Sequence, residues 1–224
     1  MQLILTGREH LGDDVWRFSF ASKYPVTWLA GQFIRIDVPH EHPDASGTSR
    51  FFTVSSSPAS QKPQITTRLT SSSFKQALAA LPDGSPVTLL DLPAGDFTWP
   101  DHLPDPVFVA HGIGITPFLS ILQDRADRHR PLPATLVHSN RPDAFVPFAA
   151  ELADLAKSHL EFTYLRLKQL PTAAFLATTF ADLSARTVYV SGPHKLLELL
   201  APPYGLTSRQ LKTDYFPGYA QSDY

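Results

Sequence analysis

The chain of 224 residues contains no cysteine. Disulfides, thiolate zinc sites, a cysteine nucleophile and a cysteine-ligated iron–sulfur cluster are therefore excluded, and we predict no metal site. A large excess of one charge is also missing, because 19 basic residues face 21 acidic ones and leave a net charge of -2. Nucleic-acid-binding proteins usually present a basic face, so nucleic acid is not an expected partner.

Long hydrophobic runs are missing as well. No stretch approaches the roughly 20 apolar residues that a membrane-spanning helix needs. The segment Met1–Glu9 has no basic region followed by a long apolar stretch, so it does not resemble a signal peptide. We therefore expect a cytoplasmic protein without a membrane span.

Hydrophobic residues make up 43% of the chain, enough to bury substantial cores. The length predicts two domains of roughly 100–120 residues each. The first hundred residues alternate apolar and polar residues in short segments, as half-buried antiparallel strands do, and one segment, Ser73–Leu81, has helical spacing behind a serine. The predicted strands are Gln2–Thr6, Val15–Phe20, Gln32–Val38, Phe51–Ser55, Gln64–Leu69 and Val87–Leu92. Six antiparallel strands and one helix predict a small β-barrel for residues 1–100, with His40–Ser49 as a polar surface loop.

A segment rich in proline and aspartate, Phe97–Pro106, separates this half from the next. Beyond it apolar strands alternate with helices, which predicts a parallel sheet covered on both faces over residues 101–224. The predicted strands are Val107–Ala110, Thr135–His138, Glu161–Leu165 and Val188–Val190. The predicted helices are Pro117–Arg128, one near Phe148–Ala156, a weaker one after Leu165 and one from about His194.

A glycine turn at the end of the first apolar strand is the strongest chemical signal. Gly112 and Gly114 can adopt backbone conformations closed to other residues and let a ligand approach the main chain. Thr116 can cap the helix that follows and Pro117 suits its first turn, so free N–H groups and the helix dipole would favour a phosphate there. An ordinary strand-to-helix turn is the alternative.

A second strand end has the same pattern in Ser191-Gly192-Pro193. Ligands of open α/β sheets bind beyond the carboxyl ends of the strands, so two glycine-rich ends indicate one shared ligand. In the first half, Arg50–Ser55 puts a cation beside aromatic and hydroxyl side chains, a combination that suits a phosphate and a flat ring. Thr70–Ser73 offers hydroxyls at a helix start. Each of these segments, taken alone, is also typical of a plain turn or a capped strand.

Taken in order, the motifs resemble the ferredoxin–NADP reductase family, in its branch with a flavin barrel followed by a nicotinamide-nucleotide domain, and the resemblance covers nearly the whole chain. The matching segments are Gly31–Phe33, Arg50–Thr53, Ser72–Lys75, Pro93–Phe97, Gly112–Pro117, Ser191–Pro193 and Asp214–Tyr219. The resemblance implies an oxidoreductase, a flavoprotein that holds FAD and exchanges hydride with NADP or NAD.

The resemblance also implies roles for single residues. Arg50 would neutralise the FAD pyrophosphate, Phe52 would lie against the flavin, and Thr53 would bond near flavin N5. Ser191 would press on the nicotinamide, so Thr53 and Ser191 are the predicted catalytic residues. Further flavin contacts are implied for Phe51, Arg68, Thr70, Ser71, Ser72 and Ser73, and for Phe216 and Tyr219 of a C-terminal aromatic tail. Nucleotide contacts are implied for Gly112, Gly114, Thr116, Arg141, Gly192 and Pro193.

Several residues depart from the family's pattern. Phe52 stands where many relatives have tyrosine, Ser191 where they often have cysteine, and His111 where many have glycine. A side chain at position 111 could crowd the dinucleotide, donate a proton or simply line the turn. The chain also continues with Ala220–Tyr224, which leaves open which aromatic residue covers the flavin.

Three functions remain in competition. The leading one is an NAD(P)H-dependent flavin reductase, a monomer that passes electrons to a separate acceptor such as ferredoxin, flavodoxin or a small molecule. Arg141 could bind a 2′-phosphate through its guanidinium, which favours NADP, or could serve as a surface charge. The other two functions are a non-catalytic FAD-binding module and an electron-transfer subunit of a larger complex.

Overall fold

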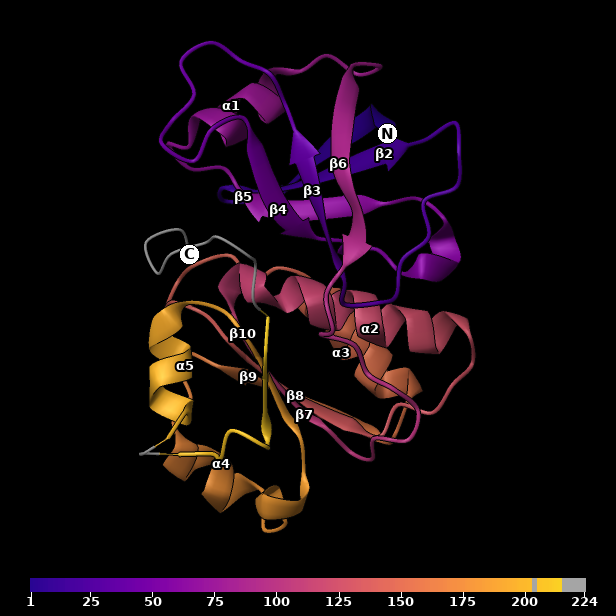
Figure 1. Cartoon of the computed structure of the whole chain (residues 1–224). Coiled ribbons are helices and arrows are strands. Elements are labelled where there is room, and N and C mark those ends of the chain that lie inside the picture. The colour runs from indigo at the N-terminus through magenta and orange to yellow at the C-terminus, as the bar shows by residue number, and fades with distance from the viewer. Residues whose placement is uncertain (203–204, 215–224) are drawn as a thin grey trace.

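The computed structural model describes residues 1–202 and 205–214, which form two sheets stacked end to end (Figure 1). The first sheet is antiparallel and has the order β4-β3-β6-β1-β2-β5. Its strands are β1 (Gln2–Gly12), β2 (Val15–Ala21), β3 (Phe33–Asp37), β4 (Ser49–Thr53), β5 (Gln64–Arg68) and β6 (Pro86–Ala94), joined by the short helices η1 (Pro58–Ser60) and α1 (Ser73–Ala80).

This sheet curls until its two terminal strands meet. The Ser55 N–H, just after β4, donates to the Gln64 carbonyl of β5 at 2.8 Å. Alternate residues point inward, as in the pairs Leu3 and Leu5 of β1 and Phe18 and Phe20 of β2, and all four are at most 1% exposed. Helix α1 closes the open end with Phe74 and Leu78. The prediction of a six-stranded antiparallel barrel is confirmed.

The second sheet is parallel and has the order β11-β10-β7-β8-β9. Its strands are β7 (Val107–His111), β8 (Ala134–Ser139), β9 (Phe162–Leu167), β10 (Val188–Ser191) and β11 (Leu211–Thr213). The helical segments are η2 (Gly112–Ile115), α2 (Thr116–Asp127), α3 (Ala149–Ser158), α4 (Ala173–Thr179), η3 (Leu183–Ala185) and α5 (His194–Leu200).

Both faces of the parallel sheet are covered, because neighbouring residues of each strand point to opposite sides. Phe108 and Tyr189 face one core, which α2 and α3 cover with residues such as Phe118 and Leu152. Val107 and Val109, together with the valines of β8 and β10, face a second core with residues of α4 and α5. The predicted α/β domain is confirmed.

Two local expectations differ from the structure. Thr116 does not cap a helix from outside: the 3-10 turn η2 runs directly into α2, whose N-cap position is Ile115, and the Thr116 hydroxyl donates to the Ile113 carbonyl at 3.3 Å. The strand β11 was not predicted, since three residues at an intermediate burial show no periodicity. Within the described ranges no helix is long and apolar enough to cross a membrane.

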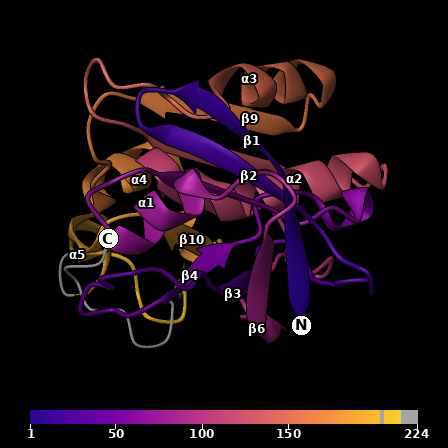
Figure 2. The ribbon, with the colours of Figure 1, turned by 90° about the horizontal axis from the view of Figure 1, so that it is seen from above.

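The two halves are fastened to each other at several points. The Ser120 hydroxyl of α2 donates to the Ser56 carbonyl of the barrel at 2.7 Å, and the Tyr189 hydroxyl donates to Thr98 at 2.7 Å. The long β1–β2 hairpin extends over the second half toward α3 (Figure 2), where the Asp13 carboxylate accepts from the Phe145 N–H at 2.8 Å. These contacts fix how the carboxyl edge of the parallel sheet faces the barrel.

Candidate functional site

A cleft of about 800 Å³ lies where the two halves meet, a size within the range of small-molecule sites. Its walls come from β4, β5 and the start of α1 on the barrel side, and from the strand ends of β7, β8 and β10 on the other. The lining residues are Asp44, Ser46, Arg50, Phe51, Phe52, Thr53, Thr66, Thr67, Arg68, Thr70, Ser71, Ser72, Lys75, His111, Gly112, Ile113, Gly114, Thr116, Asn140, Arg141, Ser191, Gly192, Pro193 and Asp214.

Sequence reasoning therefore identified most of this wall. All the predicted site residues within the described ranges line the cleft except Ser73. The Ser73 hydroxyl instead contacts the His40 imidazole at 3.0 Å and accepts from the Asp44 N–H at 2.9 Å. Phe216 and Tyr219 lie outside the described residues.

The glycine turn approaches the neighbouring strand end closely. Gly112 has a φ of +55°, in the left-handed region that favours glycine. A Cβ on Gly114 would lie 2.6 Å from the Ser191 carbonyl carbon and 2.8 Å from the Gly192 nitrogen, so no larger residue fits. Because η2 starts at Gly112, the first N–H groups of the helical segment belong to Gly112 and Ile113, and both residues line the cleft.

A buried histidine holds this turn from behind. His138 Nε2 lies 3.2 Å from the Gly112 carbonyl, which can only accept, so this nitrogen carries the proton and donates. The Tyr164 hydroxyl then donates to His138 Nδ1 at 3.1 Å. Burial lowers the pKa of His138 to about 4, which keeps the ring neutral at physiological pH. A neutral His138 of fixed tautomer therefore orients the Gly112 peptide.

The predicted catalytic residues Thr53 and Ser191 meet on a carboxyl group that sequence reasoning did not single out. Asp214, directly after β11, accepts from the Ser191 hydroxyl at 3.1 Å and from the Thr53 hydroxyl at 3.5 Å. Asp214 keeps part of its surface toward the cleft, yet burial raises its pKa to about 7 despite both hydrogen bonds, which lower it. The two halves thus share one carboxyl group that is partly protonated near neutral pH.

The barrel side of the cleft carries the cations. Arg50 is 7% exposed and forms an ion pair with Asp44, while its Nη1 donates to the carbonyls of Ser46, Gly47 and Ser49 at 2.8–2.9 Å. Arg68 forms an ion pair with Asp14 of the β1–β2 turn. Among the described residues, the Lys75 ammonium makes no hydrogen bond or ion pair, and burial together with the nearby Arg50 lowers its pKa.

The histidine at the glycine turn lies across the strand ends. The Ser139 hydroxyl donates to the Ala110 carbonyl at 3.1 Å, so it accepts from His111 Nδ1 at 3.0 Å. The Nε2 atom of a neutral His111 is then the acceptor. Burial, followed by the positive charges of Arg141 and Arg68, lowers the pKa of His111. The neutral ring therefore adds no charge to the cleft at neutral pH.

Known proteins resemble this chain in sequence and in fold. Residues 108–200 match the family model of the oxidoreductase NAD-binding domain. The chain is 30% identical over 154 residues to flavohemoprotein A of Dictyostelium discoideum, covering 63% of this chain and 39% of that protein. It is 28% identical over 176 residues to the ferredoxin reductase component of the 3-ketosteroid-9-alpha-monooxygenase of Rhodococcus rhodochrous, covering 75% and 49%. The chain thus spans less than half the length of these two curated relatives.

Solved structures extend the match to both halves. The FAD/NAD-binding domain of a Vibrio cholerae nitric oxide dioxygenase superposes with a TM-score of 0.81 at 18% identity, over 96% of this chain and 98% of that one. A Neisseria gonorrhoeae ferredoxin NADP+ reductase, solved with FAD and NADP, superposes with a TM-score of 0.71 at 19% identity, over 96% and 97%. Both halves of the chain therefore have the fold of these two structures, and residues 108–200 match an NAD-binding oxidoreductase domain. The matched domain model is one of NAD binding, and the chain resembles proteins named as flavohemoprotein, ferredoxin reductase component and ferredoxin NADP+ reductase.

The donors that line the cleft fit FAD and NADP, the two ligands of the Neisseria gonorrhoeae structure. Among the described residues the Lys75 ammonium has no counter-ion, and it lines the barrel end of the cleft together with Arg50, where an anionic ligand such as pyrophosphate would pair with both. At the other end the glycine turn leaves the main chain open, since a Cβ on Gly112 would meet no heavy atom closer than 3.7 Å. At the same end the Asp44 carboxylate forms an ion pair with Arg50.

Proposed function

We propose that the chain is an FAD-dependent oxidoreductase that exchanges hydride between NAD(P)H and FAD and passes electrons to a separate acceptor such as ferredoxin or flavodoxin. One observation carries the proposal. A single cleft joins the cations of the barrel to the glycine turns of the parallel sheet, and Thr53 and Ser191 from the two walls converge on Asp214. Two ligands held from opposite walls would thus meet beside these three side chains.

On the flavin side, Arg50, Lys75 and the Ser71–Ser72 segment would bind the pyrophosphate of FAD, and Phe52 and Thr53 would border its ring. Bound FAD would supply the redox chemistry, since the protein groups here are suited to orientation and electrostatics. The ring of Phe52 packs on Phe74 at 5.7 Å between centroids and keeps 8% of its surface exposed, so it forms a firm backing rather than a mobile cover.

On the nucleotide side, Gly112 and Gly114 would bind the phosphates, and Gly192 and Pro193 would border the nicotinamide. The Arg141 side chain lines the cleft beyond β8 and is exposed, which supports a contact with a 2′-phosphate and hence NADP. The Asn140 side chain holds this segment, because its Nδ2 donates to the Phe145 carbonyl at 2.7 Å and its Oδ1 accepts from the Arg141 N–H at 2.9 Å.

The shared carboxyl group suits the proton that accompanies hydride transfer. Bound FAD would supply the hydride chemistry, and Asp214, partly protonated near neutral pH, could hold or release a proton beside it. The Ser191 and Thr53 hydroxyls donate to the Asp214 carboxylate in the structure. Because both hydroxyls line the cleft, they would connect Asp214 to a ligand bound there.

The proposal of a protein as the electron acceptor rests on the names of two relatives. Both carry names of electron-transfer components, the ferredoxin reductase component from Rhodococcus rhodochrous and component C of the methane monooxygenase of Methylosinus trichosporium, which is 32% identical over 145 residues. These names support a separate redox protein as the acceptor. The chain has no cysteine to ligate an iron–sulfur cluster of its own.

The first test is spectroscopic. Purified protein supplied with FAD should be yellow, and anaerobic NADPH or NADH should bleach the flavin band. Protein that stays colourless after flavin addition would refute the proposal. A flavin band that neither nucleotide bleaches would favour the non-catalytic FAD-binding module, for which the His111 side chain at the nucleotide turn is the supporting observation.

Replacement of Arg50 tests the flavin contact. Arg50→Ala removes the buried cation that would bind pyrophosphate, so the flavin retained through purification should fall at least about tenfold. Arg35→Ala is the matched control, because Arg35 lies on the neighbouring strand β3 and is not part of the cleft wall. Flavin retention is measured as the ratio of the flavin absorbance at about 450 nm to the protein absorbance at about 280 nm. Equal flavin content in the two variants would contradict the assignment.

A further inference from the structure

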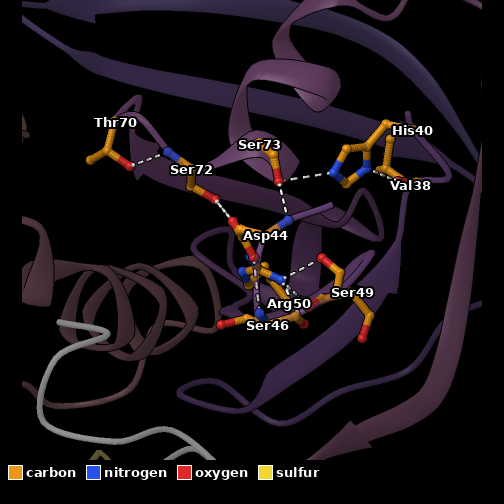
Figure 3. Close-up of polar contacts among 10 residues, drawn as sticks. Val38, His40, Asp44, Ser46, Ser49, Arg50, Thr70, Ser72 and Ser73 are labelled. Carbon is orange, nitrogen blue, oxygen red and sulfur yellow. Dashed lines mark hydrogen bonds and ion pairs between the residues drawn. The ribbon is translucent and has the colours of Figure 1, made fainter. Parts of the chain in front are cut away.

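The polar loop between β3 and β4 places a carboxylate on the donors that a phosphate ligand would use. Asp44 forms the ion pair with Arg50, and its carboxylate also accepts from the Ser46 N–H at 3.0 Å and from the Ser72 hydroxyl at 3.4 Å (Figure 3). Arg50 and Ser72 are two residues to which the proposed function gives the pyrophosphate of FAD. We call these three donors, together with the space that they surround, the anion seat.

The loop is held in this position from its other side as well. The Asp44 N–H donates to the Ser73 hydroxyl at 2.9 Å, and His40 Nδ1 donates to the Val38 carbonyl at 2.7 Å. His40 Nε2, then the acceptor in the neutral ring, receives the Ser73 hydroxyl proton at 3.0 Å. Figure 3 shows the resulting chain of bonds from the loop backbone through Ser73 to His40. Main chain and side chain of Asp44 are therefore both anchored.

Asp44 contributes little to the barrel core. Residues 41–46 are all exposed, and the Asp44 side chain keeps 36% of its surface open to solvent. Burial acts to raise the pKa of Asp44, but the hydrogen bonds from Arg50 and the Ser46 N–H outweigh it and hold the pKa below its usual range. The carboxylate is thus charged at neutral pH, and it repels a phosphate that approaches the same donors.

From these contacts we infer that Asp44 competes with the flavin phosphates, because its carboxylate occupies the anion seat. FAD binds only when the loop of residues 39–48 moves and the contacts of Asp44 with Arg50 and Ser72 break. This inference rests on the proposed function for the identity of the ligand. It makes Asp44 a residue that weakens binding of phosphate-bearing flavins and leaves binding of the isoalloxazine ring itself unchanged.

The Asp44 carboxylate fits the anion seat by its negative charge and by the number of hydrogen bonds that it accepts there. A carboxylate has two acceptor oxygens, and here Oδ1 takes Arg50 and the Ser46 N–H while Oδ2 takes the Ser72 hydroxyl. A pyrophosphate offers more oxygens and more negative charge to the same donors, and Lys75 beside them still lacks a counter-ion among the described residues. The exchange of Asp44 for pyrophosphate therefore engages a cation that Asp44 leaves unpaired.

The test compares the wild type with Asp44→Asn in equilibrium dialysis against FAD and against riboflavin. Asparagine has nearly the shape of aspartate but no charge, so the competition for Arg50 weakens. We expect FAD to bind about tenfold more tightly to Asp44→Asn, the effect of one charge-assisted hydrogen bond, and riboflavin to bind equally to both proteins. Glu41→Gln is the matched control, because it removes one negative charge from the same exposed loop.

Two further variants keep the result interpretable. Asp44→Glu retains a carboxylate and should bind FAD within about threefold of the wild type, whereas Asp44→Ser should follow Asp44→Asn. The inference is overturned if Asp44→Asn and Asp44→Ser bind FAD no more tightly than the wild type, or if riboflavin gains as much as FAD. A gain of equal size in Glu41→Gln would also overturn it, since the effect would then be one of general charge.

Inorganic pyrophosphate separates this inference from the proposed function. If neither flavin binds to any of the proteins, the proposed function fails, and isothermal titration with pyrophosphate decides about the seat. Tighter pyrophosphate binding by Asp44→Asn than by the wild type supports Asp44 as the occupant of an anion seat. Equal pyrophosphate binding refutes it.

Discussion

The carboxyl group between the two halves makes protein stability depend on pH. Asp214 has a pKa of about 7 in the folded protein, against an ordinary value of 3.8. An acid whose folded pKa is raised binds more protons in the folded than in the unfolded state between these two values. The free energy of unfolding therefore falls as pH rises from about 4 to 7 and levels off above the folded pKa.

The magnitude follows from the shift. A rise of this size corresponds to roughly 4 kcal/mol between the protonated and ionised forms. The side chain keeps part of its surface toward the cleft, where water reaches the charge, so we expect about half of this, roughly 2 kcal/mol. For a chain of this length, each 1 kcal/mol shifts the melting temperature by about 2–4 °C.

Asp214→Asn isolates the effect. Asparagine keeps an oxygen that accepts from the Ser191 and Thr53 hydroxyls but does not ionise. About 60% of this change in free energy falls between pH 5 and pH 8, so the melting temperature of the variant relative to the wild type should be about 3–5 °C higher at pH 8 than at pH 5. Differential scanning fluorimetry on flavin-free protein measures this, and Asp91→Asn, a change at a mostly exposed carboxylate of β6, is the control. A difference that is the same at both pH values would refute the reasoning.

Two further predictions concern the nucleotide wall and the joint between the halves. Gly114→Val places side-chain atoms against the Ser191 carbonyl, so NADPH affinity should fall at least about tenfold in anaerobic titration while flavin content stays constant. Gly7→Val, where a Cβ meets no atom within 4 Å, should leave both unchanged, and equal loss of flavin in Gly114→Val would speak against separate sites. Ser120→Ala removes a buried hydroxyl that links α2 to the barrel at 2.7 Å and should lower the melting temperature by about 2–6 °C. Ser158→Ala, an exposed hydroxyl on α3, should not, and a change of the same size there would refute the importance of the buried bond.

The sequence predicted the fold because each half obeys a simple periodicity. The barrel strands alternate inward and outward residues, while β7 is a continuous apolar run because both of its faces are covered. Glycine at positions 112 and 114 marked the cleft for a local reason, namely that side chains there are excluded by φ or by the neighbouring strand end. Most of the predicted wall follows from such local rules.

What the sequence could not predict depends on contacts between distant residues. Asp44 looks like one acidic residue of a polar loop, and only the folded chain brings it to Arg50 and to Ser72, 28 positions away. Asp214 follows the three-residue strand β11, which has no periodicity and exists because it pairs with β10. Its position within the Asp214–Tyr219 segment, which resembles the family, was the available signal.

The two carboxyl groups act in opposite senses at the two ends of the cleft. Asp44 lies where an anionic ligand is expected and is itself the anion, so ligand binding must release it from Arg50. Asp214 lies where the two walls meet, accepts hydrogen bonds from a hydroxyl group of each wall and is partly protonated near neutral pH. Binding of a phosphate-bearing ligand would therefore break the Asp44–Arg50 ion pair and bring the ligand near Asp214. Replacement of Asp44 should change flavin retention, whereas replacement of Asp214 should change how protein stability depends on pH.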